Sequence, residues 1–109
     1  MTDNLKIVVM KFGGTSVENP AAIRRTAEIV QSRRARGQMP IVVVSAMSKV
    51  TDQLLAAAAA AERGDRNGAL AISSRLRNRH LDAASALLSQ AALTEMRPWL
   101  EEQFGLVTM

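Results

Sequence analysis

Apolar residues first gather in two short runs, at residues 5–12 and 41–45. The first reads Leu-Lys-Ile-Val-Val-Met-Lys-Phe and the second reads Ile-Val-Val-Val-Ser. Both are too short for a helix, and their β-branched residues do not alternate with polar ones, which is typical of strands covered on both faces. Gly13 and Gly14 end the first run, and Pro40 precedes the second. We therefore predict strands at Leu5–Phe12 and Ile41–Ser45.

A helix is predicted between the two strands. Asn19 followed by Pro20 forms a start signal, because an asparagine side chain caps a helix and a proline at the first helical position loses no hydrogen bond. Gly37 is a typical helix end, and Pro40 prevents the helix from resuming. The apolar stripe of this helix carries Ile23, Ala27 and Val30.

The second half of the chain has helical spacing throughout. A helix is predicted to begin at Thr51 or Asp52 and to run through six consecutive alanines to Gly64. After a turn at residues 65–68, the 3.6-residue period predicts a helix of about 20 residues. A further short helix is predicted at Pro98–Gln103. The apolar stripe of the long helix consists of Ile72, Leu76, Ala83, Leu87 and Ala91.

The order strand, helix, strand, then helices predicts an α/β fold that begins with a βαβ unit. Its two strands should be parallel and its crossover right-handed. Both strand-exit loops, residues 13–19 and 46–50, should then lie at the same carboxyl edge of the sheet. Open α/β sheets bind their ligands at that edge.

Composition excludes several classes of site. The 109 residues are 48% hydrophobic and 22% charged, which is typical of a globular chain. With no cysteine and one histidine, disulfides, thiolate metal sites and histidine-rich zinc sites are excluded. We expect no membrane association and a cytoplasmic location, because the apolar runs are too short to cross a bilayer and the N-terminus lacks a secretory pattern.

The net charge of +4 comes entirely from the first 54 residues, where eight bases face four acids. This excess raises the alternative of a nucleic-acid-binding module built on the basic first helix. Single-strand grooves usually add aromatic stacking platforms, however, and none of the aromatic residues Phe12, Trp99 and Phe104 lies among the arginines. We therefore expect no nucleic-acid partner.

The first exit loop has the chemistry of a phosphate site. Lys11 ends the strand, where an ammonium group can reach a phosphate. Gly13 and Gly14 let backbone N–H groups approach an anion closely, and Thr15 and Ser16 add hydroxyl donors. The same residues also fit a tight turn with a surface lysine, and spacing alone leaves both interpretations open.

The second exit loop adds hydroxyls and a lysine. Its sequence from residue 45 to 52 is Ser-Ala-Met-Ser-Lys-Val-Thr-Asp. Thr51 is a good candidate for a helix cap, and Asp52 suits the first helical turn. Free N–H groups at this helix start would also receive an anionic substrate. The spacing of these residues does not distinguish a helix cap from a substrate-binding site.

These two loops together resemble the opening of an aspartate kinase (aspartokinase), a member of the amino acid kinase superfamily. The resemblance is carried by Val-Met-Lys-Phe-Gly-Gly-Thr-Ser-Val at residues 9–17 and by Val-Val-Val-Ser-Ala-Met-Ser-Lys-Val-Thr-Asp at residues 42–52. It implies the N-terminal βαβ unit and helices of an amino acid kinase-type parallel-sheet sandwich, incomplete in this chain.

The resemblance also implies roles for individual residues. Lys11 would be catalytic and would contact the transferred phosphoryl group, with Ser45 near both the phosphates and the amino acid. Thr51 would help to bind aspartate. The implied ATP- and phosphate-binding residues are Lys11, Phe12, Gly13, Gly14 and Ser45, of which Phe12 would mainly pack.

The implied reaction is phosphorylation of the L-aspartate side-chain carboxylate by ATP to 4-phospho-L-aspartate. This is the first step towards lysine, threonine and methionine. Mg²⁺ would be carried by the nucleotide, with no protein ligand in this chain. The parent enzyme would be a homo-oligomer.

We expect residues 1–109 to be the N-terminal portion of an amino acid kinase domain, without regulatory ACT domains and inactive alone, since later family segments complete the ATP and aspartate sites. One alternative is a non-catalytic, kinase-like interaction protein. Another is a kinase for glutamate or acetylglutamate, which the Thr-Ser-Val and Ser-Ala-Met strings disfavour. His80 has no companion ligand or nucleophile and is interpreted as structural.

Overall fold

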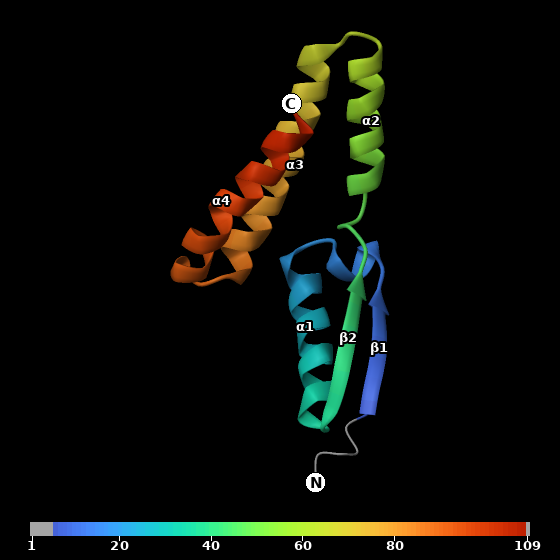
Figure 1. Ribbon diagram of the computed structural model, residues 1–109, viewed down its shortest axis with the longest axis vertical. Coiled ribbons are helices and arrows are strands. Elements are labelled where there is room, and N and C mark those ends of the chain that lie inside the picture. Colours follow the sequence, from blue (N-terminus) through green and yellow to red (C-terminus); the bar gives the residue numbers. More distant parts are fainter. Residues whose placement is uncertain (1–5, 109) are drawn as a thin grey trace. The chain divides into compact units, whose positions relative to one another are not determined.

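A computed structural model describes residues 6–108, and Leu5, the predicted start of the first strand, lies outside them. The chain divides into two compact units, Met1–Ser48 and Lys49–Met109. The elements, labelled in Figure 1, are β1 (Lys6–Phe12), a 3-10 turn η2 (Gly14–Val17), α1 (Pro20–Ala35), β2 (Gln38–Val44), α2 (Val50–Glu62), α3 (Arg66–Leu87) and α4 (Gln90–Val107).

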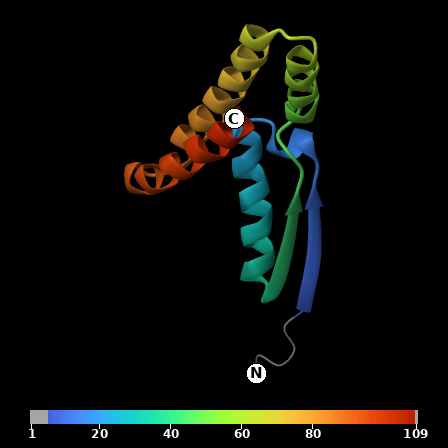
Figure 2. The same cartoon turned by 45° about the horizontal axis from the view of Figure 1, so that its top comes forward.

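The first unit is the predicted βαβ unit, so the α/β class is confirmed. β1 and β2 pair in parallel, from Lys6 opposite Gln38 to Phe12 opposite Val44. Figure 2 shows the two strands side by side, with α1 running along β2. The parallel pairing brings both strand-exit loops to one edge of the sheet, as predicted.

The predicted signals at both ends of α1 are confirmed. The Asn19 side chain accepts a hydrogen bond from the Ala22 N–H at 2.8 Å, and Pro20 is the first helical residue. At the other end Gly37 has a positive φ of 78°, a conformation that glycine adopts without the steric cost that a Cβ brings.

β2 begins earlier than predicted, at Gln38 instead of Ile41, and ends at Val44. Pro40 was predicted to lie outside the strand but is paired opposite Val8. An extended strand accepts the fixed φ of proline, and a strand with one hydrogen-bonded neighbour tolerates the missing N–H on its other side. Within residues 6–108, β1 is the only such neighbour of β2.

The apolar strands are not covered on both faces. In β1 the alternate residues Val8, Met10 and Phe12 are half-buried. Ile7 and Val9 on the opposite face are 64% and 67% exposed. The prediction of two covered faces is therefore wrong for the part of the chain that the structure describes.

Over residues 49–108, the second unit consists of three helices, α2, α3 and α4. α3 begins at Arg66, inside the turn predicted at residues 65–68, because the Asp65 side chain caps it by accepting from the Gly68 N–H at 3.0 Å. The hydrophobic core of the second unit lies between α3 and α4. It contains Leu81, Ala84 and Leu100, against which Leu88, Leu93 and Phe104 pack. Among residues 6–108 no helix combines the length and apolar composition needed to cross a membrane.

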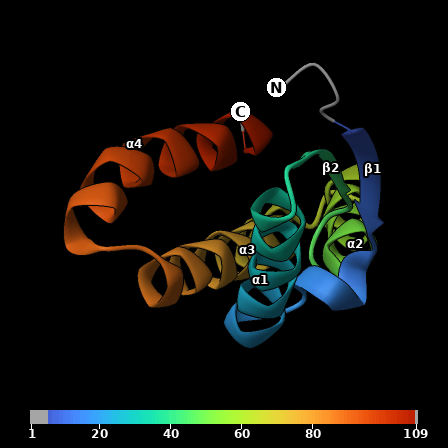
Figure 3. The same cartoon turned by 90° about the horizontal axis from the view of Figure 1, so that it is seen from below.

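The predicted short helix at Pro98–Gln103 is wrong, since α4 spans Gln90–Val107 with Pro98 inside it. Leu88 is extended, and the Ser89 hydroxyl caps α4 by accepting from the Ala92 N–H at 3.2 Å. The chain therefore turns between α3 and α4 (Figure 3), and Ala91, predicted on the stripe of the long helix, belongs to α4.

Candidate functional site

The two strand-exit loops of the first unit are joined by backbone hydrogen bonds. The Ser45 N–H donates to the Phe12 carbonyl at 3.1 Å, extending the ladder by one residue beyond the strands. The Ser48 N–H then donates to the Gly14 carbonyl, also at 3.1 Å. These contacts hold the Gly-Gly-Thr-Ser turn against the segment that follows β2.

Adjacent glycines in the first loop have different surroundings. A Cβ placed on Gly14 would lie 3.3 Å from both the Ala46 carbonyl oxygen and the Ser48 Cα. A Cβ placed on Gly13 would meet no atom within 4 Å, and its φ of −80° suits any residue. The fold of this unit therefore needs a glycine at position 14 for close loop packing, but does not need one at position 13.

Three carbonyls of the first loop point to donors within the unit. The Gly13 carbonyl accepts from the Ser16 N–H at 3.0 Å, and the Gly14 carbonyl accepts from Ser48. The Ser16 carbonyl accepts from the Thr26 hydroxyl at 2.8 Å. A carbonyl oxygen repels an anion, so a loop whose carbonyls are held in this way is better suited to a phosphate.

Thr26 was missed by the sequence analysis. It lies in α1, three residues after Ile23 of the apolar stripe, and is 8% exposed. Buried hydroxyls are normally hydrogen-bonded. A threonine on the apolar side of the helix that follows a glycine-rich loop could therefore have been predicted to bond to that loop.

Lys11 and Ser45 lie at the carboxyl edge of the sheet. Lys11 is exposed and, by strand alternation, shares the open face of β1 with Ile7 and Val9. Ser45 is exposed, and its hydroxyl makes one long contact of 3.5 Å with the carbonyl of half-buried Phe12. An ammonium group and a hydroxyl therefore accompany the glycine loop at this edge.

Thr51 belongs to the second unit. It is the second residue of α2, which begins at Val50, and the residue at the cap position is Lys49. Lys49 makes no side-chain cap hydrogen bond and has a positive φ of 74°. The interpretation of Thr51 as the helix cap is therefore wrong.

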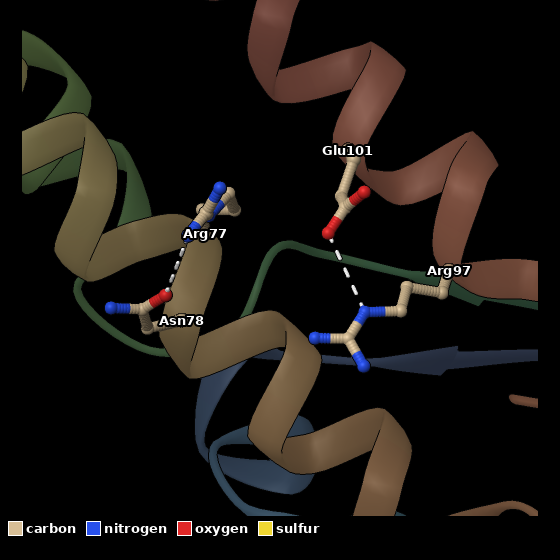
Figure 4. A network of polar contacts seen from close by, with 4 residues as sticks. All are labelled: Arg77, Asn78, Arg97 and Glu101. Carbon is tan, nitrogen blue, oxygen red and sulfur yellow. Dashed lines mark hydrogen bonds and ion pairs between the residues drawn. The ribbon is translucent and has the colours of Figure 1, made fainter.

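Other polar groups of the second unit make local contacts. Arg97 and Glu101 of α4 form an ion pair at 3.4 Å, and Arg77 of α3 donates to the neighbouring Asn78 at 3.4 Å. Figure 4 shows both contacts. His80 Nδ1 lies 2.7 Å from the Leu76 carbonyl, and its ring packs against Phe104 at 5.2 Å, as expected for a structural histidine. Residues 6–108 contain no cluster of three or more acidic, histidine or cysteine side chains suited to a metal ion.

Comparison of the sequence with known proteins identifies a family and several relatives. The model of the amino acid kinase family matches residues 6–102. The aspartokinase of Rickettsia felis is 45% identical over 51 residues, which are 47% of this chain and 13% of that protein. The aspartokinase of Mycobacterium tuberculosis is also 45% identical over 51 residues, which are 12% of its length. The aspartokinase of Corynebacterium glutamicum is 43% identical over 56 residues, or 51% of this chain and 13% of that protein.

The similarity to these aspartokinases covers about half of this chain but a small part of each relative. The family model extends much further and includes both units of the structure. The chain belongs to the amino acid kinase family.

Proposed function

We propose that this chain supplies the phosphate-binding part of an enzyme that transfers the γ-phosphoryl group of Mg-ATP to the side-chain carboxylate of L-aspartate. The observation that carries the proposal is the junction of the two exit loops, where the Ser48 N–H donates to the carbonyl of Gly14, three residues after Lys11 near the end of β1. The names of the relatives, all aspartokinases, favour aspartate over other amino acid substrates.

In the proposed reaction a carboxylate oxygen of aspartate attacks the γ-phosphorus in line. A new P–O bond forms, the bond to the β-phosphate oxygen breaks, and ADP leaves with its electron pair. Little covalent chemistry falls to the protein, so positioning and charge stabilisation dominate. The Lys11 ammonium stabilises the transferred phosphoryl group, and the amides of Gly13 and Gly14 face the phosphates.

The proposal also assigns roles to three further residues of the chain. Ser45 lies near the phosphates and the amino acid, Thr51 helps to bind aspartate, and Phe12 packs beneath the loop. ATP brings its own Mg²⁺, and the enzyme is a cytoplasmic homo-oligomer that opens the route to lysine, threonine and methionine. The 109 residues alone are proposed to be inactive, since the similar segments form only 12–13% of the aspartokinases above.

A chimera tests the role of the chain. The 56-residue segment of the Corynebacterium glutamicum aspartokinase that matches this chain is replaced by its counterpart here, and aspartyl phosphate formation is measured. We expect the chimera to be active and Lys11→Ala to lower its kcat about 100- to 1000-fold, the usual effect of removing a charge-stabilising donor.

Lys6→Ala is the matched control, because Lys6 is an exposed lysine at the opposite end of the same strand. Its kcat should stay close to that of the chimera. Equal losses from both variants, or near-normal turnover of Lys11→Ala, would contradict the proposed role of Lys11.

A further inference from the structure

We infer that Thr26 is a positioning residue for the phosphate loop, which its hydroxyl holds through the Ser16 carbonyl; this inference rests on the function proposed for the loop. Thr26 lies in α1, ten residues from Ser16, and the distance from its Oγ1 to the Ser16 oxygen is 2.8 Å. Its side chain is buried in a unit whose sheet is largely exposed.

The partner of this hydrogen bond distinguishes Thr26 from the helical residues Ser32 and Thr94. Ser32 donates to the Ile29 carbonyl at 2.7 Å and Thr94 donates to the Gln90 carbonyl at 2.8 Å, both within their own helices. Such bonds to the preceding turn are the ordinary choice of serine and threonine in a helix. The Thr26 hydroxyl instead leaves its helix and ties α1 to the 3-10 turn.

The bond fixes the end of the loop that the strand ladder does not reach. Ser45 and Ser48 hold Phe12 and Gly14 from the side of β2. Ser16 lies beyond these contacts, and Thr26 holds it from the side of α1. The turn between them is therefore fixed at both ends, and its amides are arranged before any phosphate arrives, which lowers the entropic cost of binding.

Loss of the hydroxyl leaves the Ser16 carbonyl without this partner and loosens the turn. A net hydrogen-bond contribution of the usual size corresponds to an increase of about two- to tenfold in the population of the open loop. The change should be local, because the Ser45 contact to Phe12 belongs to the strand ladder and does not involve Thr26.

Amide hydrogen exchange in the 109-residue chain, followed by NMR, tests the inference. The Ser16 amide reports on the turn, and the Ser45 amide is the internal reference for the ladder. Thr26→Ala and Thr26→Ser differ only in the hydroxyl, and Thr26→Val provides a second variant of near-native volume. We expect exchange at Ser16 to be about two- to tenfold faster in the Ala and Val variants, relative to Ser45, and to be restored in the Ser variant.

A matched control is Thr94→Val, which removes a helical hydroxyl of the second unit and should leave both reporter amides unchanged. Equal acceleration at Ser16 and Ser45 in Thr26→Ala would mean that Thr26 stabilises the unit as a whole, and would overturn the inference. An Ala variant that exchanges like the Ser variant would overturn it as well.

A titration with inorganic tripolyphosphate separates this inference from the proposed function. The amides of Gly13, Gly14 and Thr15 should shift at millimolar tripolyphosphate, with affinity about two- to tenfold weaker in the Ala and Val variants than in the Ser variant. If no form of the chain responds, the proposed phosphate site is contradicted in this chain, while the exchange ratio still decides the role of Thr26.

Discussion

Replacing Gly14 with alanine tests whether the two exit loops are held together by close backbone packing. The added Cβ would lie 3.3 Å from the Ala46 oxygen and from the Ser48 Cα, and 3.4 Å from the Ser48 nitrogen. All three are backbone atoms, so no flexible side chain can move aside. The loops must separate by a few tenths of an ångström, which stretches the hydrogen bond from Ser48 to the Gly14 carbonyl.

The expected loss of stability follows from two opposed effects. Overpacking costs about 1–3 kcal/mol. Alanine also restricts the unfolded chain, which stabilises the folded state by about 0.4–1 kcal/mol where the backbone conformation is compatible. Gly14 begins a 3-10 turn without a positive φ, so this gain applies. We expect Gly14→Ala to destabilise the first unit by about 0.5–2 kcal/mol.

The assay must report on the first unit alone. The single tryptophan, Trp99, lies in α4 of the second unit, so its fluorescence does not follow the sheet. Exchange of the Ser45 amide, which is bonded to Phe12, does follow it. The expected destabilisation corresponds to exchange about two- to thirtyfold faster, since 1.4 kcal/mol is a factor of ten.

Gly13→Ala is the matched control, because its Cβ would meet no atom within 4 Å. This variant should exchange at Ser45 as slowly as the unaltered chain or more slowly, yet it should bind tripolyphosphate less well, because the Cβ stands where the proposed phosphate approaches. The reasoning is refuted if Gly14→Ala leaves exchange unchanged, or if Gly13→Ala accelerates it equally.

Three further predictions concern the second unit. Lys49→Gly should stabilise it by about 0.5–1 kcal/mol, because relief of the positive φ outweighs the greater freedom of the unfolded chain; a lower urea midpoint by Trp99 fluorescence would contradict this. Asp65→Ala should destabilise it by about 0.5–2 kcal/mol through loss of the α3 cap. Asp65→Asn keeps the acceptor, so a loss as large as that of the alanine variant would assign the effect to charge and not to capping. In the active chimera Thr51→Val should raise the KM for aspartate more than that for ATP, whereas the reverse would place Thr51 in the nucleotide site.

The first unit was predictable because its signals are local and agree with one another. The β-branched runs, the Asn19-Pro20 start and Gly37 each act within a few residues, and together they lead to one βαβ arrangement. Parallel pairing then places both exit loops at one edge without any knowledge of their side chains. The structure then shows the two loops joined at that edge by the hydrogen bond from Ser48 to Gly14, which the topology alone does not predict.

The helices of the second unit were predictable as helices but not in their bounds. Pro98 looks like a helix start, yet it lies inside α4, where packing of Leu93, Leu100 and Phe104 compensates for the missing N–H. Tertiary burial overrides the local preference of a proline here. The start of α2 was misplaced for a related reason, since Lys49 at the cap position is an unfavourable residue in a left-handed conformation.

The candidate site separates into residues that its fold needs and residues that it does not. The neighbouring loop packs closely against Gly14, and the Thr26 hydroxyl bonds to the turn at Ser16. The fold therefore explains why a glycine and a threonine stand at these two positions. Lys11 is exposed, Gly13 has open space at its Cβ position, and the Ser45 hydroxyl makes only a long contact. Because the loops are joined through backbone atoms, these three side-chain choices are not explained by packing within residues 6–108. The proposed phosphate binding would account for all three at once, since it calls for a cation, an unobstructed amide and a hydroxyl at one edge of the sheet.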